Sequence, residues 1–321
     1  MISSYEKKLI WILIGVVILG TIFFGTEFLS VKTLLIMANK LPEYGLISIA
    51  LMITLLVAGI NLSIVYMTTL SGIIGALMMH CFNDLGFISA LVGIVVMLLI
   101  GALTGAINGT VISYLDVPPI LTTLGTMMLF KGIALNITKG GAITSFPIVF
   151  TYIGNGKILG IPLPLLVFLG VAVIISWILG SSTFGKQLYR IGKNKQAAIY
   201  SGINVKKVVL QAHIIAGIIA GITAVIMSAR YNSIRVDYGA TYLLNGLVIV
   251  SLGGIDIKGG KGTIKGVLIA IVIMSTVLRI LNLAYVDTNL ISTIMGVILL
   301  INIFVQYSSD RRSKHKIEKE I

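Results

Sequence analysis

Five polar residues interrupt long apolar stretches of the chain, and their side chains are the ones that could contact a solute. Asn61 and Ser63 lie in the break AGINLS, Tyr66 follows one turn later, Asn108 lies inside an apolar run, and Asn245 opens another. Neutral amide and hydroxyl groups donate and accept hydrogen bonds, which suits a polyhydroxyl solute such as a sugar. The alternative is hydrogen bonding between helices, which is common in membrane bundles and is favoured for any one of these residues taken alone.

The sequence shows none of the motifs of a metal or nucleotide site. The three histidines are scattered, and neither HExxH, CxxC nor GxxxxGK[ST] occurs. The Gly-rich, basic segment 259–263 lacks the phosphate-loop spacing and predicts a tight turn between membrane segments. We therefore expect no catalytic residue, no metal and no cofactor. If ATP drives this protein, the ATPase must be a separate chain.

Composition indicates which elements position these residues. Hydrophobic residues make up 57% and charged residues 11% of the 321 residues, and the mean hydropathy is +1.06. A soluble domain carries about 25% charged residues. Runs such as 163–179 are continuously apolar, whereas a barrel strand would alternate polar and apolar residues. The sequence predicts an all-α, polytopic membrane bundle.

Ten apolar runs predict ten spans. They lie at 9–25, 41–59, 62–80, 87–112, 118–138, 163–181, 207–229, 241–254, 266–284 and 289–306. With the N-terminus inside, 16 of the 24 Lys and Arg fall on the cytoplasmic side and 6 outside. This predicts a multi-pass protein of a prokaryotic plasma membrane with both termini cytoplasmic. The net charge of +13 is then explained by anchoring at anionic lipid, without nucleic acid.

Ionisable residues are scarce in the predicted spans. Lys131 and Arg279 lie near span ends, where they could reach the interface. Aspartates fall at predicted ends or loops, namely Asp84, Asp116, Asp237, Asp256 and Asp287. Proton-coupled carriers usually bury carboxylates at mid-membrane. The pattern disfavours the alternative function, a stand-alone ion-coupled secondary transporter of a small polar solute.

The one long cytoplasmic loop, 182–206, predicts a short helix with Asn194 as its N-cap and Gly202 as its stop. Such a helix could dock a soluble partner, but composition alone favours a solvated, lipid-anchoring loop.

Residues 183–266 resemble the membrane permease subunits of ABC importers for simple sugars, the ribose-type permeases. The specific pattern is GxNxxAAxxSGI, with Lys193 at its second position; AGINLS and the segment 124–141 also fit. The resemblance implies a type II, vitamin-B12-importer-like arrangement in which two permeases pair. It also implies separate ATPase subunits, an extracytoplasmic solute-binding protein, and import of a monosaccharide or similar small polar solute.

The resemblance also assigns parts of the chain. Residues 1–321 form one permease domain, with a coupling loop at 182–206 and a basic cytoplasmic tail at 307–321. In the loop, the residues expected to couple to the ATPase are Lys193, Asn194, Ala197, Ala198 and Gly202.

Three positions depart from the family pattern. The family usually has GIDLS and YELDAIAA, so its acids are replaced here by Asn61, Leu243 and Asn245. Either this chain is one half of a heterodimer whose other half keeps the acids, or its solute differs from the usual pentose or hexose.

Overall fold

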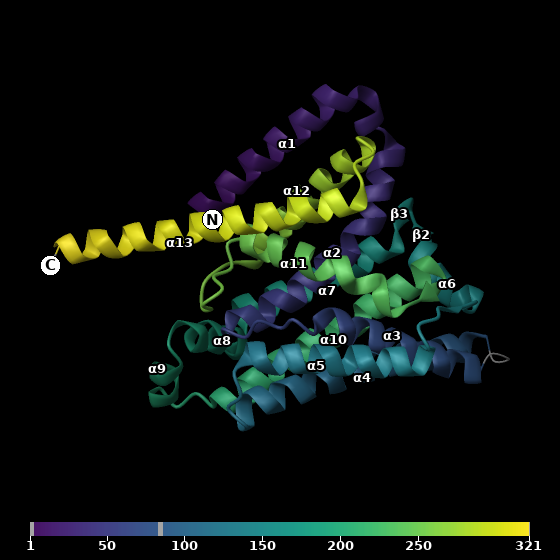
Figure 1. Ribbon diagram of the computed structural model, residues 1–321, viewed down its shortest axis with the longest axis horizontal. Coiled ribbons are helices and arrows are strands. Elements are labelled where there is room, and N and C mark those ends of the chain that lie inside the picture. The colour runs from purple at the N-terminus through teal and green to yellow at the C-terminus, as the bar shows by residue number, and fades with distance from the viewer. Residues whose placement is uncertain (1–2, 83–85, 321) are drawn as a thin grey trace.

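The protein is described by a computed structural model covering residues 3–82 and 86–320, with side chains placed up to residue 304. In this part of the chain the backbone is predominantly helical, which confirms the predicted polytopic helical bundle (Figure 1). The helices are α1 Ser4–Phe28, α2 Val31–Leu56, α3 Ile64–Cys81, α4 Phe87–Tyr114, α5 Pro119–Thr138, α6 Ile148–Asn155, α7 Leu163–Ser181, α8 Thr183–Lys193, α9 Lys195–Tyr200, α10 Val205–Tyr231, α11 Ala240–Leu252, α12 Ile264–Leu283 and α13 Thr288–Glu320.

Short strands tie connections together. Strand β1 (Ile143–Thr144) pairs antiparallel with β4 (Ser233–Ile234), and β2 (Lys157–Ile158) pairs antiparallel with β3 (Ile161–Pro162). A 3-10 turn, η2 (Val236–Gly239), leads from β4 into α11. The β1–β4 pair therefore fixes the segment before α6 to the end of α10.

Each predicted span overlaps an apolar helix. Eight helices are long and apolar enough to cross a membrane, and the segments Val236–Leu252 and Thr288–Phe304 are shorter apolar helices. The predicted start of the second span at residue 41 was wrong, because α2 begins at Val31. The Ser30 side chain caps the helix by accepting from the Thr33 amide at 3.2 Å. Lys32 and Lys40, which precede the predicted start of the span, thus lie on α2.

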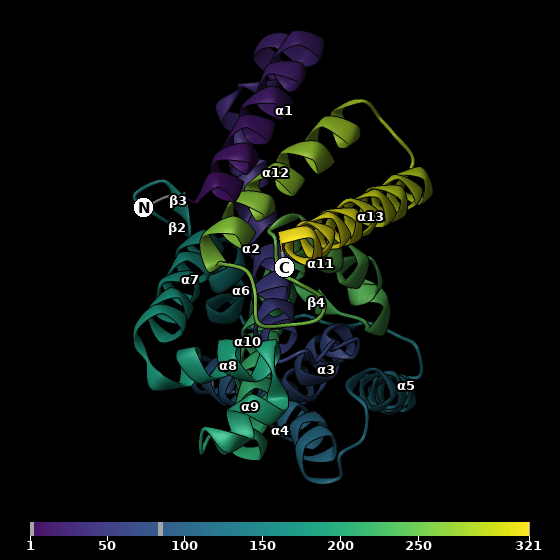
Figure 2. The ribbon, with the colours of Figure 1, turned by 90° about the vertical axis from the view of Figure 1, so that its left-hand side faces the viewer.

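Helix α10 lies at the centre of the bundle and packs against α2, α3 and α4 (Figures 1 and 2). The α4–α10 contact is made by glycines: Gly101 faces the backbone of Gly217, and Gly105 faces the backbone of His213. Glycines let membrane helices approach closely, and packing rather than hydrophobicity drives helix association in lipid. This contact is a close, glycine-lined seam between two long helices.

The bundle has two distinct ends. Helices α8 and α9 lie at one end, which we call the α9 end, and α6 with the β2–β3 hairpin lies at the other, the α6 end (Figure 1). Helix α1 packs on α12, away from α4 and α5 (Figure 2). Asp84, predicted to lie in a loop, falls outside the described residues.

Candidate functional site

The break between α2 and α3 brings three of the predicted solute-pathway residues together. The Asn61 Oδ1 accepts from the Ser63 amide at 3.1 Å and from the Ser63 hydroxyl at 2.8 Å. Asn108 on α4 donates from its Nδ2 to the Ser63 Oγ at 2.7 Å. All three side chains are fully buried. The break is therefore fastened to α4 by a polar network, which we call the break network.

The other two pathway residues lie outside this network. Tyr66 is half-buried, and the Lys131 ammonium lies 5.6 Å from the centroid of its ring, so Lys131 is engaged within the bundle. Asn245 is buried on α11, and no hydrogen bond joins it to the break network among the described residues. The Asn108 Oδ1 is buried without a hydrogen-bond partner. A solute contact for any of the five stays a prediction.

Replacing Ser63 by alanine should loosen the break network. Asn108 would lose its hydrogen bond to the Ser63 hydroxyl, which costs about 1–3 kcal/mol for a buried unsatisfied group, and Asn61 would keep only the amide of residue 63 as a donor. Ser71→Ala is the matched control, since the Ser71 hydroxyl bonds only within its own helix, to the Met67 carbonyl at 2.6 Å. Thermal unfolding in detergent would measure both. Equal losses in the two variants would contradict a bridging role for Ser63.

The loop 182–206 contains the predicted short helix. The Asn194 Oδ1 accepts from the Ala197 amide at 3.0 Å and so caps α9, and Gly202 follows the helix with a φ of +76°, which favours glycine. The predicted cap and stop are thus confirmed. Lys193, Asn194, Ala197 and Gly202 are exposed. Ala198 is only 3% exposed, so its side chain faces its own chain.

Two residues that the sequence analysis did not select form the outer face of α9. Ile199 is 45% exposed and Tyr200 is 87% exposed. The sequence offered one indication of this face, because Ile199 and Tyr200 are large apolar residues in a loop rich in polar and basic residues. Lys195, with its Nζ 3.4 Å from the Asp116 Oδ1, links α9 to the α4–α5 connection. The α9 face thus presents an aromatic and an aliphatic side chain beside basic residues.

Helix α8, which leads into α9, contacts the end of α2 and a glycine-rich loop that follows α11. The Gly260 amide donates to the Leu56 carbonyl at the end of α2, at 3.0 Å. Gly192 on α8 abuts both groups so closely that a Cβ would clash. The Tyr189 hydroxyl of α8 donates to the Gly262 carbonyl at 3.1 Å, and burial raises the pKa of Tyr189. These contacts therefore connect α8 to the end of α2, next to the α2–α3 break.

The Gly-rich segment 259–263, predicted as a tight turn, lies in the loop 253–263 that connects α11 to α12. Gly259 and Gly260 have φ values of +87° and +71°, which residues with a side chain rarely adopt. The Lys258 amide donates to the Asp256 carboxylate at 2.9 Å, and the Lys261 ammonium lies 3.6 Å from the same side chain. The loop is therefore ordered by its own contacts while its glycines touch α2 and α8.

A buried ionic cluster near the α6 end was missed by the sequence analysis. Glu43 on α2 is 0% exposed and accepts from the Arg230 Nη1 at 2.6 Å and from the Tyr231 hydroxyl at 3.0 Å. The Tyr242 hydroxyl also donates to it, and Tyr44 stacks on Tyr242 with ring centroids 4.8 Å apart. The sequence offered one indication of the cluster, because Glu43 is an acidic residue inside the predicted span 41–59. The cluster joins α2, α10 and α11.

The family of the chain is shown by its similarity to known proteins. Residues 33–303 match the model of a family described as a branched-chain amino acid transport system, permease component. The chain belongs to this permease family. Together with the relatives described next, this match confirms the resemblance to simple-sugar importer permeases that residues 183–266 carry, and the permease is a multi-pass membrane component rather than an enzyme in itself.

Relatives of the permease are named for D-allose transport and for autoinducer 2 import. The D-allose transport system permease protein of Escherichia coli is 32% identical over 294 residues, covering 86% of this permease and 89% of the relative. The autoinducer 2 import system permease proteins of Escherichia coli and Shigella flexneri are 34% identical over 215 residues, covering 65% of both chains. No solved structure matches the permease.

Proposed function

We propose that this permease is the membrane subunit of an ABC importer that moves a monosaccharide or similar small polar solute into the cytoplasm. The observation that carries the proposal is its similarity to the D-allose permease protein over 86% of its length. The neutral amide and hydroxyl groups at Asn61, Ser63, Tyr66, Asn108 and Asn245 support a polyhydroxyl solute. ATP would be hydrolysed on a partner chain.

The proposed assembly has the α9 end in the cytoplasm of a prokaryote and both termini on that side. Two permeases would pair in the bilayer, ATPase subunits would bind α9 from below, and a solute-binding protein would deliver solute at the α6 end. Exposed Ile199 and Tyr200 support the docking role of α9, because aromatic anchors dominate binding energy at interfaces. The basic residues of the same end support its cytoplasmic orientation.

The proposed coupling route runs through the glycine loop. Movement of α9 would carry α8, and Gly192 would transmit it to Gly260 and to the end of α2. Close-packed contacts change between discrete arrangements rather than deform continuously. The hydrogen bond that joins Ser63 in the break network to Asn108 on α4 would then be rearranged. The path beside the break would open or close as a result.

The neutral residues at the family's acidic positions give two versions of this proposal. Asn61 and Asn245 are buried, and Leu243 is half-buried, so an acid at the first two positions would place a charge inside the bundle. Purifying the complex and sequencing its membrane subunits separates the versions. A single permease species would exclude the heterodimer and favour a solute unlike the usual sugars.

Replacing Tyr200 by aspartate should abolish coupling without unfolding the permease. We expect ATP-driven solute uptake by the reconstituted complex to fall by more than about tenfold, the effect of losing one hot-spot residue. The thermal stability of the permease should be unchanged, because surface substitutions usually lie within about 0.5 kcal/mol. Tyr285→Asp is the matched control, since Tyr285 is 95% exposed and follows α12 at the α6 end.

Two outcomes would contradict the proposal. Normal uptake by Tyr200→Asp would remove α9 as the docking element. Uptake driven by a proton gradient in vesicles without ATP would replace the importer by an ion-coupled carrier.

A further inference from the structure

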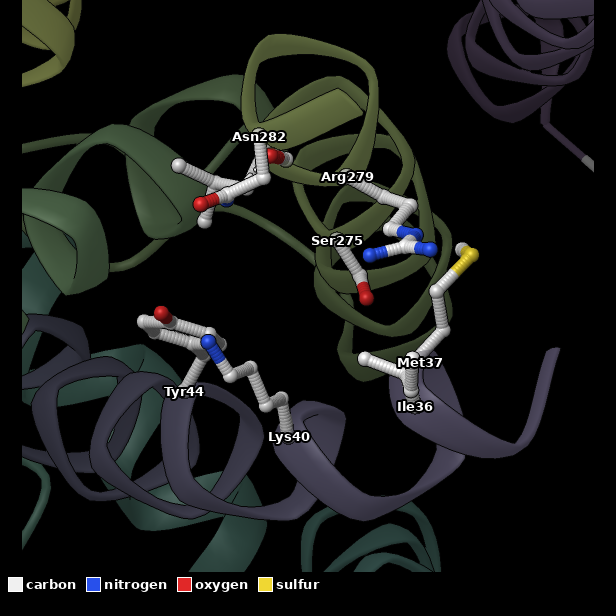
Figure 3. A pocket seen from close by; sticks show the side chains of 8 residues that line it. Ile36, Met37, Lys40, Tyr44, Ser275, Arg279 and Asn282 are labelled. Carbon is white, nitrogen blue, oxygen red and sulfur yellow. Dashed lines mark hydrogen bonds between the residues drawn. The ribbon is translucent and has the colours of Figure 1, made fainter. Parts of the chain in front are cut away.

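A small polar pocket lies between α2 and α12, away from the break network and from α8 and α9. Its lining comes from Ile36, Met37, Lys40, Tyr44, Ser275, Leu278, Arg279 and Asn282. Figure 3 shows Lys40 and Tyr44 on α2 facing Ser275, Arg279 and Asn282 on α12. Because Lys40 lies in the first half of α2 and Arg279 in the last half of α12, the pocket lies toward the α6 end (Figure 1).

The pocket carries two positive charges and no negative one. None of its lining residues is acidic, and no ion pair engages Lys40 or Arg279 among the described residues. The neighbouring carboxylate, Glu43, already pairs with Arg230. Cations within membrane segments are expensive unless a counter-charge accompanies them. An anionic ligand would therefore balance the positive charges of Lys40 and Arg279 in the pocket.

Arg279 has unused hydrogen-bonding capacity. Its Nη2 donates to the Thr33 hydroxyl at 2.9 Å, which orients the guanidinium. Its Nε is buried without a hydrogen-bond partner, although a guanidinium carries five N–H donors. An acceptor group with several oxygens would use the donors that the protein leaves free.

The chemistry of the lining selects a phosphate group. Guanidinium pairs with phosphate through parallel hydrogen bonds, and lysine adds a point charge. The hydroxyl of Ser275 and the amide of Asn282 add neutral polar groups at the same wall. Ile36 and Met37 on α2 and Leu278 on α12 add apolar side chains to the lining, which would suit the glycerol and first methylenes of a lipid. We propose that this pocket binds a phosphate group, supplied by an anionic phospholipid or by a soluble phosphate.

Native mass spectrometry and thermal unfolding of the purified permease would test the site and its source. The probes are phosphatidylglycerol, phosphatidylcholine and inorganic phosphate, added separately to delipidated protein. We expect phosphatidylglycerol to stay bound and to raise the unfolding temperature, with phosphatidylcholine weaker. Arg279→Gln and Lys40→Gln should each weaken binding about tenfold, the effect of losing one charge-assisted hydrogen bond.

Lys157→Gln is the matched control, because Lys157 is an exposed lysine on β2 at the same end. Inorganic phosphate binding with the same dependence on Lys40, but no lipid binding, would identify a soluble phosphate as the source. If Arg279→Gln does not fold, Lys40→Gln alone decides. Wild-type affinity in the Lys40 variant, equal losses in the Lys157 variant, or no binding of any probe would overturn the proposal.

Discussion

Replacing Arg230 by methionine is expected to lower the free energy of unfolding by about 3–5 kcal/mol at neutral pH. The substitution would keep much of the side-chain volume but leave the Glu43 carboxylate, 0% exposed, without its cation. The hydroxyls of Tyr231 and Tyr242 would still donate to Glu43, yet they carry no charge. Unfolding in detergent by heat or denaturant would measure the loss.

A double variant separates the ion pair from simple packing. Glu43→Gln removes the charge and keeps an acceptor for the tyrosines, so adding it to Arg230→Met should recover more than about 1 kcal/mol of the loss. Arg235→Met is the matched control, since Arg235 is exposed just beyond β4, and it should change stability by less than about 0.5 kcal/mol. If the double variant is no more stable than Arg230→Met, the cluster contributes through packing alone.

Enlarging Gly217 is expected to separate α4 from α10. A Cβ at this position would collide with the Gly101 carbonyl and lie 3.1 Å from the Gly105 Cα. Overpacking of this kind costs about 1–3 kcal/mol for alanine, and leucine should cost at least as much as the upper limit. Alanine also stabilises a helix by roughly 1 kcal/mol relative to glycine. Gly217→Ala is therefore destabilising only because the overpacking cost is larger than this gain.

The matched control for the α4–α10 seam is a glycine at which an added Cβ should not lower stability. A Cβ added at Gly170 on α7 would meet nothing within 4 Å, so Gly170→Ala should be neutral or stabilising by up to about 1 kcal/mol. Both variants would be compared by unfolding temperature and by yield of folded protein in detergent. Similar behaviour of Gly217→Ala and Gly170→Ala would show that α10 is free to move away from α4.

The local chemistry of the chain could be predicted without coordinates. Long apolar runs with few charges inside them identified the helices, because lipid tolerates little else. Asn194 and Gly202 marked the limits of α9 because capping and positive φ depend on the residues themselves. The start of α2 was missed because only the apolar run from residue 41 was read as a span, whereas the helix begins ten residues earlier at the Ser30 cap.

The residues alone are enough to identify this chain as a helical membrane permease with a short helix inside its one long loop. Which polar residues meet could be learned only from the folded chain: Ser63 with Asn108, Glu43 with Arg230, and Lys40 with Arg279 across one pocket. Members of these pairs are separated by dozens to hundreds of residues, so no local pattern encodes the contact. Their meeting depends on how closely the helices approach and in which rotation, and packing against neighbours sets both.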